Sequence, residues 1–270
     1  MLCDLCGKSA ARLELTVIDA HCHLYSNKYH DDLHEVIQRA QEKLQLVVIS
    51  AVDQESLRKS LAIRRKYPDF IRVTAGVHPR SAAKLNQEEL TELWQVIRTV
   101  REEIVAIGEV GPDFYHVKDH RLHLRQLSVL EDAMAQAEAM DLPLVIHARQ
   151  AEKAALEVVA RCTTDVLFHC FAGTRQMARE ITARGFYLSF SAILLFSSEL
   201  QRAATEVPLE LILAETDSPA LSPRRSQRRN EPAFLESIIS RLATLFDYPV
   251  EKAGSITAAN AARFYGIADL

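Results

Sequence analysis

Short apolar runs recur along the chain, and longer stretches with helix-forming composition separate them. The runs are nearly all apolar rather than alternating, which is typical of parallel strands buried on both faces. The stretches between them are rich in Ala, Glu, Leu and Gln, which favour helices. The predicted strands are residues 15–20, 45–51, 71–77, 104–109, 143–148, 165–170, 185–190 and 211–215. Predicted helices include residues 33–44, 88–102, 122–140 and 176–183.

The alternation of strands and helices predicts the fold class. Eight strands alternating with helices in 270 residues indicate an α/β protein with a (β/α)8 TIM barrel, and an open doubly wound sheet is the alternative. No linker divides the chain, so we expect a single barrel domain at 15–270 after an N-terminal extension at 1–14. A barrel predicts that the chemistry lies at the carboxyl ends of its strands.

Composition limits the functional classes. The net charge of −4 argues against a protein that coats nucleic acid through bulk charge, although a local basic patch is compatible with it. Five cysteines fit reduced thiols better than a disulfide framework, which predicts a cytoplasmic protein. No apolar run approaches the roughly 20 residues that cross a bilayer, and no secretion signal is visible, so we expect no membrane association.

Polar side chains follow six of the predicted strands. The residues at these positions are His21, His23, His78, Glu109, His147, His169 and Asp217. A charged or imidazole side chain after an apolar run is costly to bury unless it is paired or binds a metal. In a closed barrel these strand ends meet, so four imidazoles and two carboxylates could converge: His21, His23, His147, His169, Glu109 and Asp217.

This set predicts a metal centre. His21 and His23 are two residues apart on a strand and therefore share a face. Alone, such a pair is a weak signal, and a core histidine bonded to the backbone is the alternative. Six ligands are too many for one tetrahedral zinc and suit two divalent ions that share a carboxylate. Mixed nitrogen and oxygen ligands fit Zn²⁺ or Mn²⁺, and Mg²⁺ less comfortably.

The chain resembles the TatD family of metal-dependent deoxyribonucleases, which belongs to the amidohydrolase-like barrels. The matching motifs are IDAHCHL at 18–24, GVHP at 76–79, IGEVG at 107–111, VIHAR at 145–149, FHCFAG at 168–173, ETDSP at 215–219, NEP at 230–232 and TAANA at 257–261. The resemblance runs from about residue 17 to the C-terminus. It implies hydrolysis of phosphodiester bonds, often from the 3′ end of DNA. We therefore expect a 3′–5′ exonuclease whose partner is DNA, single-stranded or at 3′ ends, with no obligate protein partner.

The resemblance also implies a role for each residue. His21 and His23 would hold one ion with Asp217, and Glu109 would bridge to a second ion. His147 and His169 would hold that second ion. Glu109 and Asp217 would be the catalytic residues, with Asp217 accepting a proton from the attacking water. His78 would lie near the substrate phosphate.

Arginines near the predicted site are candidates for substrate binding. Arg149 follows His147, where it could contact phosphate or pair with a structural carboxylate. Arg224, Arg225, Arg228 and Arg229 follow the eighth strand. Guanidinium groups bind phosphate through paired hydrogen bonds, so Arg225 and Arg228 are predicted to contact the substrate; a solvated charged loop is the alternative.

Ala220 departs from the family pattern, because an aromatic residue usually follows the Asp motif. The absence of an aromatic residue removes an aromatic surface for a base and leaves room for an alternative, an amidohydrolase or esterase with two metals that acts on a small molecule. A noncatalytic metal-binding scaffold is a separate alternative, which predicts that ligands are lost; all six are present here.

The remaining His, Cys and Trp residues are assigned structural roles. We expect His116, His120 and His123 to form a surface helical face, and His30 and His34 to lie at the surface. Cys3 and Cys6 have no second ligand pair nearby, so a zinc site is not predicted there. Cys22 and Cys170 read as small buried hydrophobes, and Trp94 as a core residue.

Overall fold

A sheet of eight parallel strands forms the centre of the computed structural model, which describes residues 17–224 and 229–268. The strands are β1 Ile18–Cys22, β2 Leu46–Ala51, β3 Ile71–Ala75, β4 Ala106–Val110, β5 Leu144–Ile146, β6 Val166–Phe168, β7 Tyr187–Phe190 and β8 Ile212–Ala214. They follow one another in chain order from β1 to β8. The predicted extension at 1–14 lies outside the described residues.

The sheet closes between its first and last strands. Cys22 and Ser218 form a parallel bridge, and the backbone N–H of His23 donates to the Ser218 carbonyl at 2.7 Å. The Asp217 N–H donates to the His21 carbonyl at 3.0 Å. The predicted (β/α)8 barrel is therefore confirmed, and the open doubly wound sheet is wrong.

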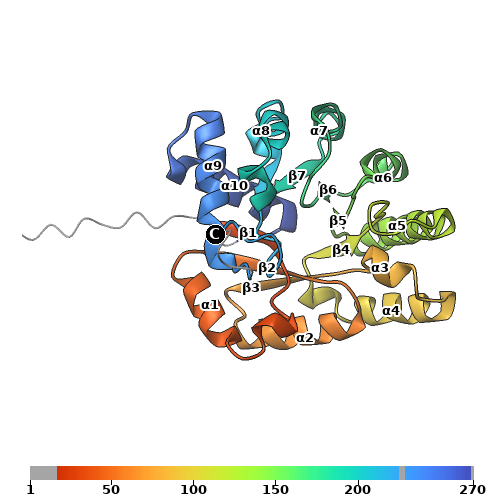
Figure 1. The fold of residues 1–270 in the computed structure, drawn as a ribbon. Coiled ribbons are helices and arrows are strands. Elements are labelled where there is room, and N and C mark those ends of the chain that lie inside the picture. Colours follow the sequence, from red (N-terminus) through yellow and green to blue (C-terminus); the bar gives the residue numbers. More distant parts are fainter. Residues whose placement is uncertain (1–16, 225–228, 269–270) are drawn as a thin grey trace, which may run out of the picture.

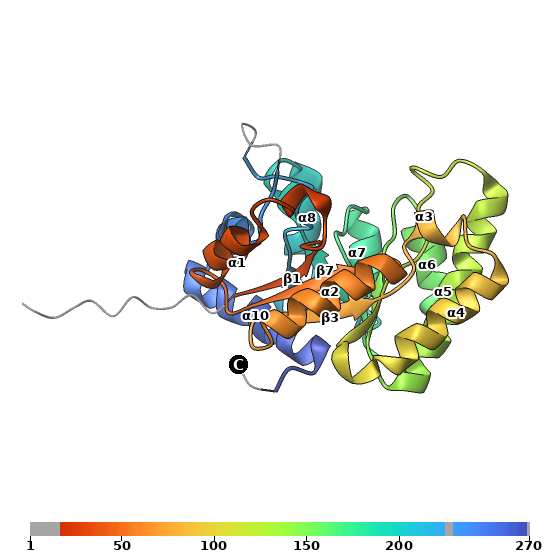
Figure 2. The same ribbon diagram turned by 90° about the horizontal axis from the view of Figure 1, so that it is seen from below.

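Helices surround the strands on the outside of the barrel (Figure 1). They are α1 Leu33–Gln41, α2 Gln54–Lys66, α3 Pro79–Ala82, α4 Gln87–Thr99, α5 His120–Met140, α6 Glu152–Val159, α7 Arg175–Thr182, α8 Ser198–Thr205, α9 Glu236–Phe246 and α10 Val250–Tyr265. Helices α4 and α5 lie side by side (Figures 1 and 2), and Arg98 Nε donates to Gln136 Oε1 across them at 2.8 Å. Within the described ranges, no helix is both long and apolar enough to cross a membrane.

Buried apolar side chains form two clusters. The larger contains the side chains between the strands and the outer helices, among them Val47, Ile49 and Trp94. In the smaller, alternate residues of β2 such as Val48 pack with Phe264 of α10. Because neighbouring residues of a strand point to opposite faces, the two clusters are the two sides of the barrel wall.

Local capping explains where several helices begin. Asn86 accepts the Glu89 N–H at 3.0 Å, and Glu89 accepts the Asn86 N–H at 2.8 Å, so the two residues form a capping box at the start of α4. Asp119 accepts the Arg121 N–H at 2.9 Å, so α5 begins at His120 rather than at the predicted residue 122.

The strand ends differ from their predicted positions in ways that concern the site. β1 extends to Cys22 instead of ending at residue 20, so His21 lies within the strand. β5 and β6 end at Ile146 and Phe168, one residue before His147 and His169 respectively. These histidines therefore lie where the backbone leaves the sheet.

Candidate metal centre

Glu109 on β4 is at the centre of the polar cluster and is only 2% exposed. Glycines on either side allow β4 to approach β5. A Cβ on Gly108 would lie 2.3 Å from the Val145 carbonyl oxygen, and one on Gly111 would lie 2.1 Å from that of His147. Both glycines also have positive φ angles, of 134° and 143°. Only glycine permits this approach, which brings Glu109 next to the end of β5.

One oxygen of Glu109 faces the histidines of β1. Glu109 Oε2 lies 3.4 Å from His21 Nε2 and 3.8 Å from His23 Nε2. His23 Nε2 also lies 3.2 Å from Asp217 Oδ1, beyond the end of β8. His21, His23 and Asp217 thus form a group whose ligand atoms lie within 4.8 Å of one another.

The other oxygen of Glu109 faces a second group of histidines. Oε1 lies 2.7 Å from His147 Nδ1 and 3.0 Å from His169 Nε2. His78 Nε2 lies 3.5 Å from the same oxygen. The structure therefore brings all six predicted ligands together, and Glu109 separates them into two groups.

The imidazoles of His23 and His147 each contact a second acceptor, on the side of the ring away from Glu109. His23 Nδ1 lies 2.9 Å from the Ser50 carbonyl oxygen, and His147 Nε2 lies 3.3 Å from Asp113 Oδ2. Each acceptor favours the proton on the nitrogen that faces it, which leaves the other nitrogen with a lone pair. That other nitrogen is the one that points toward Glu109 in both rings.

Glu215 faces the corresponding nitrogen of His169 as an ionic neighbour, without a hydrogen bond to it. Its Oε1 lies 3.4 Å from His169 Nδ1, while its Oε2 accepts a 2.5 Å hydrogen bond from Ser189 Oγ. The sequence prediction missed the roles of Asp113 and Glu215. A signal was available, because both belong to the same strand ends as Glu109 and Asp217, and histidines that bind metals usually carry a carboxylate or carbonyl partner.

His78 has the opposite arrangement of protons. Its Nδ1 accepts the Arg80 N–H at 3.1 Å, so the neutral ring carries its proton on Nε2, toward Glu109. Burial lowers the pKa of His78 to about 4, although the charge of Glu109 opposes this shift. The ring is therefore neutral at neutral pH and presents a hydrogen-bond donor, which suits contact with a phosphate.

The chemistry of the donor set fits a divalent metal. His21 Nε2 and Glu109 Oε2 are buried and have no hydrogen-bond partner among the described residues. Two ligand atoms about 2.1 Å from one tetrahedral ion would lie about 3.4 Å apart. The His21–Glu109 and His23–Asp217 pairs, at 3.4 and 3.2 Å, match that separation.

The two carboxylates remain ionised. Burial alone would raise the pKa of Glu109, but the imidazoles around it, His169 first, hold it well below its usual range. Burial likewise opposes ionisation of Asp217, and the contact with His23 outweighs it and lowers the pKa. Ionised carboxylates are the form that binds metal ions or accepts a proton.

The structure describes two of the four residues predicted to bind substrate. His78 and Arg149 line a cavity of about 500 Å³ that also contains Glu109 and Asp217. Arg225 and Arg228 lie outside the described residues, so their contact with substrate stays a prediction.

Two other arginines of the loop after β8 already have partners. Arg229 donates to Asp32 at 2.6 and 2.7 Å and to Glu231 at 3.0 Å. The guanidinium of Arg224 lies 4.1 Å from the ring centre of Phe234. The carboxylates that bind Arg229 occupy the donors that a phosphate would need.

His116 is not part of a surface helix, so that prediction is wrong for this residue. Because Asp119 starts α5 at His120, His116 precedes the helix and lines the cavity. Its Nδ1 lies 2.8 Å from Asp113 Oδ2. Asp113 therefore contacts both His116 and His147, whereas His123 donates to the Val117 carbonyl at 2.7 Å.

The assignments of the other residues are mostly confirmed. Cys22 and Trp94 are buried, at 0% and 4% exposed, and His30 and His34 are exposed. Cys170 is only partly buried and lines the cavity, with Sγ 3.2 Å from Ser191 Oγ, so its interpretation as a buried hydrophobe is wrong. The backbone at Cys170 has a φ of 46°.

The cysteines of the described residues form no disulfide. Cys22, Cys162 and Cys170 are free thiols, whereas Cys3 and Cys6 lie outside the described residues. The cytoplasmic location stays a prediction.

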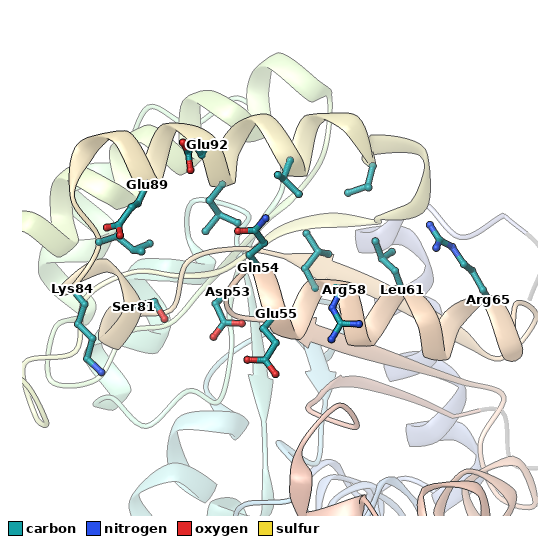
Figure 3. Close-up of a pocket in the computed structure, with 15 residues that line it drawn as sticks. Asp53, Gln54, Glu55, Arg58, Leu61, Arg65, Ser81, Lys84, Glu89 and Glu92 are labelled. Carbon is teal, nitrogen blue, oxygen red and sulfur yellow. The ribbon is translucent and has the colours of Figure 1, made fainter.

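A larger cavity, of about 1000 Å³, lies between α2 and α4 on the outside of the barrel (Figure 3). Its acidic residues include Asp53 and Glu89, which cap the two helices. Arg65 lines the same groove and pairs with Glu103 at 2.7 Å. These side chains are engaged locally, so we place the chemistry in the smaller cavity.

A TIM-like barrel with clustered His, Glu and Asp side chains at the carboxyl ends of its strands defines the class of metal-dependent hydrolases. Residues 18–266 match the family described as TatD related DNase. The chain belongs to this family.

Individual relatives agree with this assignment. The chain is 32% identical to the uncharacterized metal-dependent hydrolase YabD of Bacillus subtilis over 93% of this chain and 99% of that protein. It is 28% identical to the 3′-5′ ssDNA/RNA exonuclease TatD of Erwinia tasmaniensis, over 93% of this chain and all of that protein (100%). The crystal structure of a TatD family hydrolase from Entamoeba histolytica superposes with a TM-score of 0.85 at 23% identity, covering 92% of this chain and 97% of that chain, which supports the fold.

Proposed function

We propose that the protein is a deoxyribonuclease that removes nucleotides from the 3′ end of single-stranded DNA with two divalent ions bound at Glu109. The observation that carries this proposal is that the two oxygens of the Glu109 carboxylate face two different groups of histidines. Its Oε2 faces His21 and His23, and its Oε1 faces His147 and His169. A carboxylate placed between two groups of ligands in this way could serve both ions of a two-metal hydrolase.

The proposed ligand sets follow from these groups. His21, His23 and Asp217 would hold one ion, and His147 and His169 would hold the other. Both ions would share Glu109. When bound, such ions polarise the phosphoryl group and lower the pKa of the attacking water.

Two further roles belong to groups that face the cavity. The ionised Asp217 would accept a proton from the attacking water, because its Oδ1 is directed to the same ring atom that faces Glu109. His78 would donate from Nε2 to a phosphoryl oxygen and hold the phosphate toward Glu109.

The relatives support DNA as the substrate class. The matching family is described as a DNase, and the Erwinia relative is named an exonuclease of single-stranded DNA and RNA. The cavity of about 500 Å³ would admit one terminal nucleotide rather than a duplex.

Cleavage of a single-stranded oligonucleotide labelled separately at each end tests the proposal. With Mg²⁺ or Mn²⁺, we expect a ladder that shortens from the 3′ end, and EDTA should abolish it. Asp217→Asn should lose this activity while it retains the wild-type circular dichroism spectrum. A ladder from the 5′ end, or internal cuts, would refute the stated polarity.

A small-molecule substrate is the second candidate, and Ala220 favours it. This residue lines the cavity where the family usually has an aromatic side chain for a base. Metal-loaded protein that hydrolyses a small ester or amide but leaves DNA intact would replace the nuclease with this candidate. Metal-loaded protein that hydrolyses none of them would favour a noncatalytic scaffold.

A further inference from the structure

Two arginines at the cavity have no carboxylate partner among the described residues. Arg80, in the first turn of α3, and Arg149, after β5, both line the cavity. Neither forms an ion pair with a described Asp or Glu. The carboxylates that line the same cavity, Glu109, Asp113 and Asp217, each lie within 3.5 Å of an imidazole nitrogen. Because none of these carboxylates forms an ion pair with Arg80 or Arg149, both guanidinium groups remain able to bind an anion.

Backbone contacts hold Arg149 in place. The Arg149 N–H donates to the Pro112 carbonyl at 3.2 Å, and its carbonyl accepts the Phe114 N–H at 3.0 Å. Asp113 and Arg149 also form a parallel bridge. The segment after β4 and the segment after β5 thus form one unit, which fixes the base of the Arg149 side chain beside His147.

The side chains of Arg149 and Lys118 both lie against the ring of Tyr115. Tyr115 is 45% exposed, and its ring centre lies 5.1 Å from the Arg149 guanidinium and 5.2 Å from Lys118 Nζ. Cations are attracted to an aromatic ring at such distances. Positive charge therefore extends from Arg149 in the cavity to Lys118 outside it. We call Arg80, Lys118 and Arg149 the rim cations.

The rim cations contrast with other arginines of the chain. Arg229 pairs with Asp32, and Arg65 pairs with Glu103. The chain as a whole has a net charge of −4. Positive charge that stays unpaired beside one cavity of an acidic protein attracts a polyanion to that cavity.

We propose that the rim cations bind the phosphates next to the scissile phosphodiester, so that the enzyme prefers substrates carrying at least one additional phosphate. This inference rests on the proposed nuclease function and adds its substrate preference. Arg149 would contact the neighbouring phosphate, and Lys118 would contact one further along the strand. The ligand class is a single-stranded polynucleotide, recognised through its backbone rather than through its bases.

Binding measured without cleavage is the first test. Fluorescence anisotropy of a labelled oligothymidylate in EDTA reports affinity at several salt concentrations. For a single strand, each phosphate contact contributes about 0.7 to the slope of log affinity against log salt. We expect Arg80→Ala, Lys118→Ala and Arg149→Ala each to lower the slope by about that amount, and Arg149→Lys to restore most of it.

A matched variant distinguishes specific contacts from loss of overall charge. Arg58 lies in the groove between α2 and α4, away from the site (Figure 3). Arg58→Ala removes the same charge and should leave the slope and the affinity unchanged. An equal loss in Arg58→Ala and the rim variants would overturn the inference, as would wild-type slopes in all of them.

Hydrolysis of two short substrates is the second test. One is a thymidine dinucleotide with a single phosphodiester, and the other carries an additional 5′-phosphate. We expect the wild type to have the higher kcat/KM on the second, and the rim variants to lose more on the second than on the first. Equal losses on both would refute a role for the rim cations in binding neighbouring phosphates.

The two tests separate this inference from the proposed function. If the protein cleaves no phosphodiester but the rim variants still lower the salt slope, the nuclease proposal fails and polyanion binding stands. If the wild type cleaves DNA and the rim variants bind it with normal slopes, the nuclease proposal stands and this inference fails.

Discussion

The two cavities differ in what their polar side chains contact. The groove between α2 and α4 has about twice the volume, about 1000 Å³ against about 500 Å³. Asp53, which lines it (Figure 3), bonds to a near neighbour: its side chain accepts the Ser56 N–H at 2.8 Å. In the smaller cavity Glu109 meets imidazoles that come from other strands, up to 88 residues before it and 60 after it (109 − 21 and 169 − 109).

The difference teaches that convergence of buried charge, rather than volume, marks the site. A cap such as Asp53 has a structural reason to be where it is, since it satisfies the first turn of a helix. Glu109 has no such local role and is 2% exposed. Burying a carboxylate is costly, so the barrel retains Glu109 only together with its surrounding imidazoles.

Among variants that test this difference between the cavities, Glu109→Gln should cause the largest loss of kcat/KM on DNA. The amide keeps the shape of the carboxylate but loses the charge that both groups of ligands share. We expect kcat/KM on DNA to fall by about 1000-fold or more, the loss typical of removing an electrostatic group aimed at the reacting atoms. Steady-state hydrolysis of a labelled oligonucleotide measures it.

Glu92→Gln is the matched control in the groove, because it makes the same chemical change on an exposed side chain of α4. Its kcat/KM should remain at the wild-type value. A similar loss of activity in both variants would show that the groove takes part in the reaction and would remove the distinction between the cavities.

Asp113→Asn and Glu215→Gln should have smaller effects. Each residue orients a predicted ligand, His147 and His169 respectively, through the ring nitrogen that faces away from Glu109. Loss of such a partner costs about 10- to 100-fold in metal affinity. Competition with a fluorescent chelator measures this affinity, and rates at saturating metal should recover substantially. Unchanged affinity in both variants would contradict the orienting role.

The sequence predicted which residues lie together in the candidate site, because strand position determines this. Apolar runs identified the strands, and a parallel barrel then brings residues such as His21, Glu109 and His169 to one end whatever the loops do. The same logic failed where a local feature set the position. The spacing of His116, His120 and His123 suggested one helical face, but α5 begins only at His120, so spacing alone did not place His116.

The pattern of apolar and polar residues does not predict contacts between segments that are far apart in the chain. Nothing near Arg229 in the chain indicates that Asp32, 197 residues away, binds its guanidinium. The orienting role of Asp113 likewise depends on the exact approach of β4 to β5, which Gly108 and Gly111 permit. Periodicity locates strands, but it does not give the register that decides such pairs.

Of these variants, Asp53→Ala should have the smallest effect. It should lower the free energy of unfolding and leave kcat/KM on DNA unchanged. Asp53 Oδ1 accepts hydrogen bonds from the Ser56 N–H at 2.8 Å and from Ser56 Oγ at 2.7 Å, which together fix the start of α2. Loss of a cap of this kind costs about 1 kcal/mol. Urea unfolding should show that decrease in the free energy of unfolding, with kcat/KM on DNA unchanged.

Asp69→Ala provides the reference for that measurement, because Asp69 is exposed before β3 and caps no helix among the described elements. A surface change of this kind usually shifts stability by less than about 0.5 kcal/mol. If Asp53→Ala lost activity without losing stability, the groove would have a functional polar group after all. Asp53 would then act in the reaction as well as cap α2, and the distinction between a cavity of helix caps and a cavity of converging ligands would no longer hold.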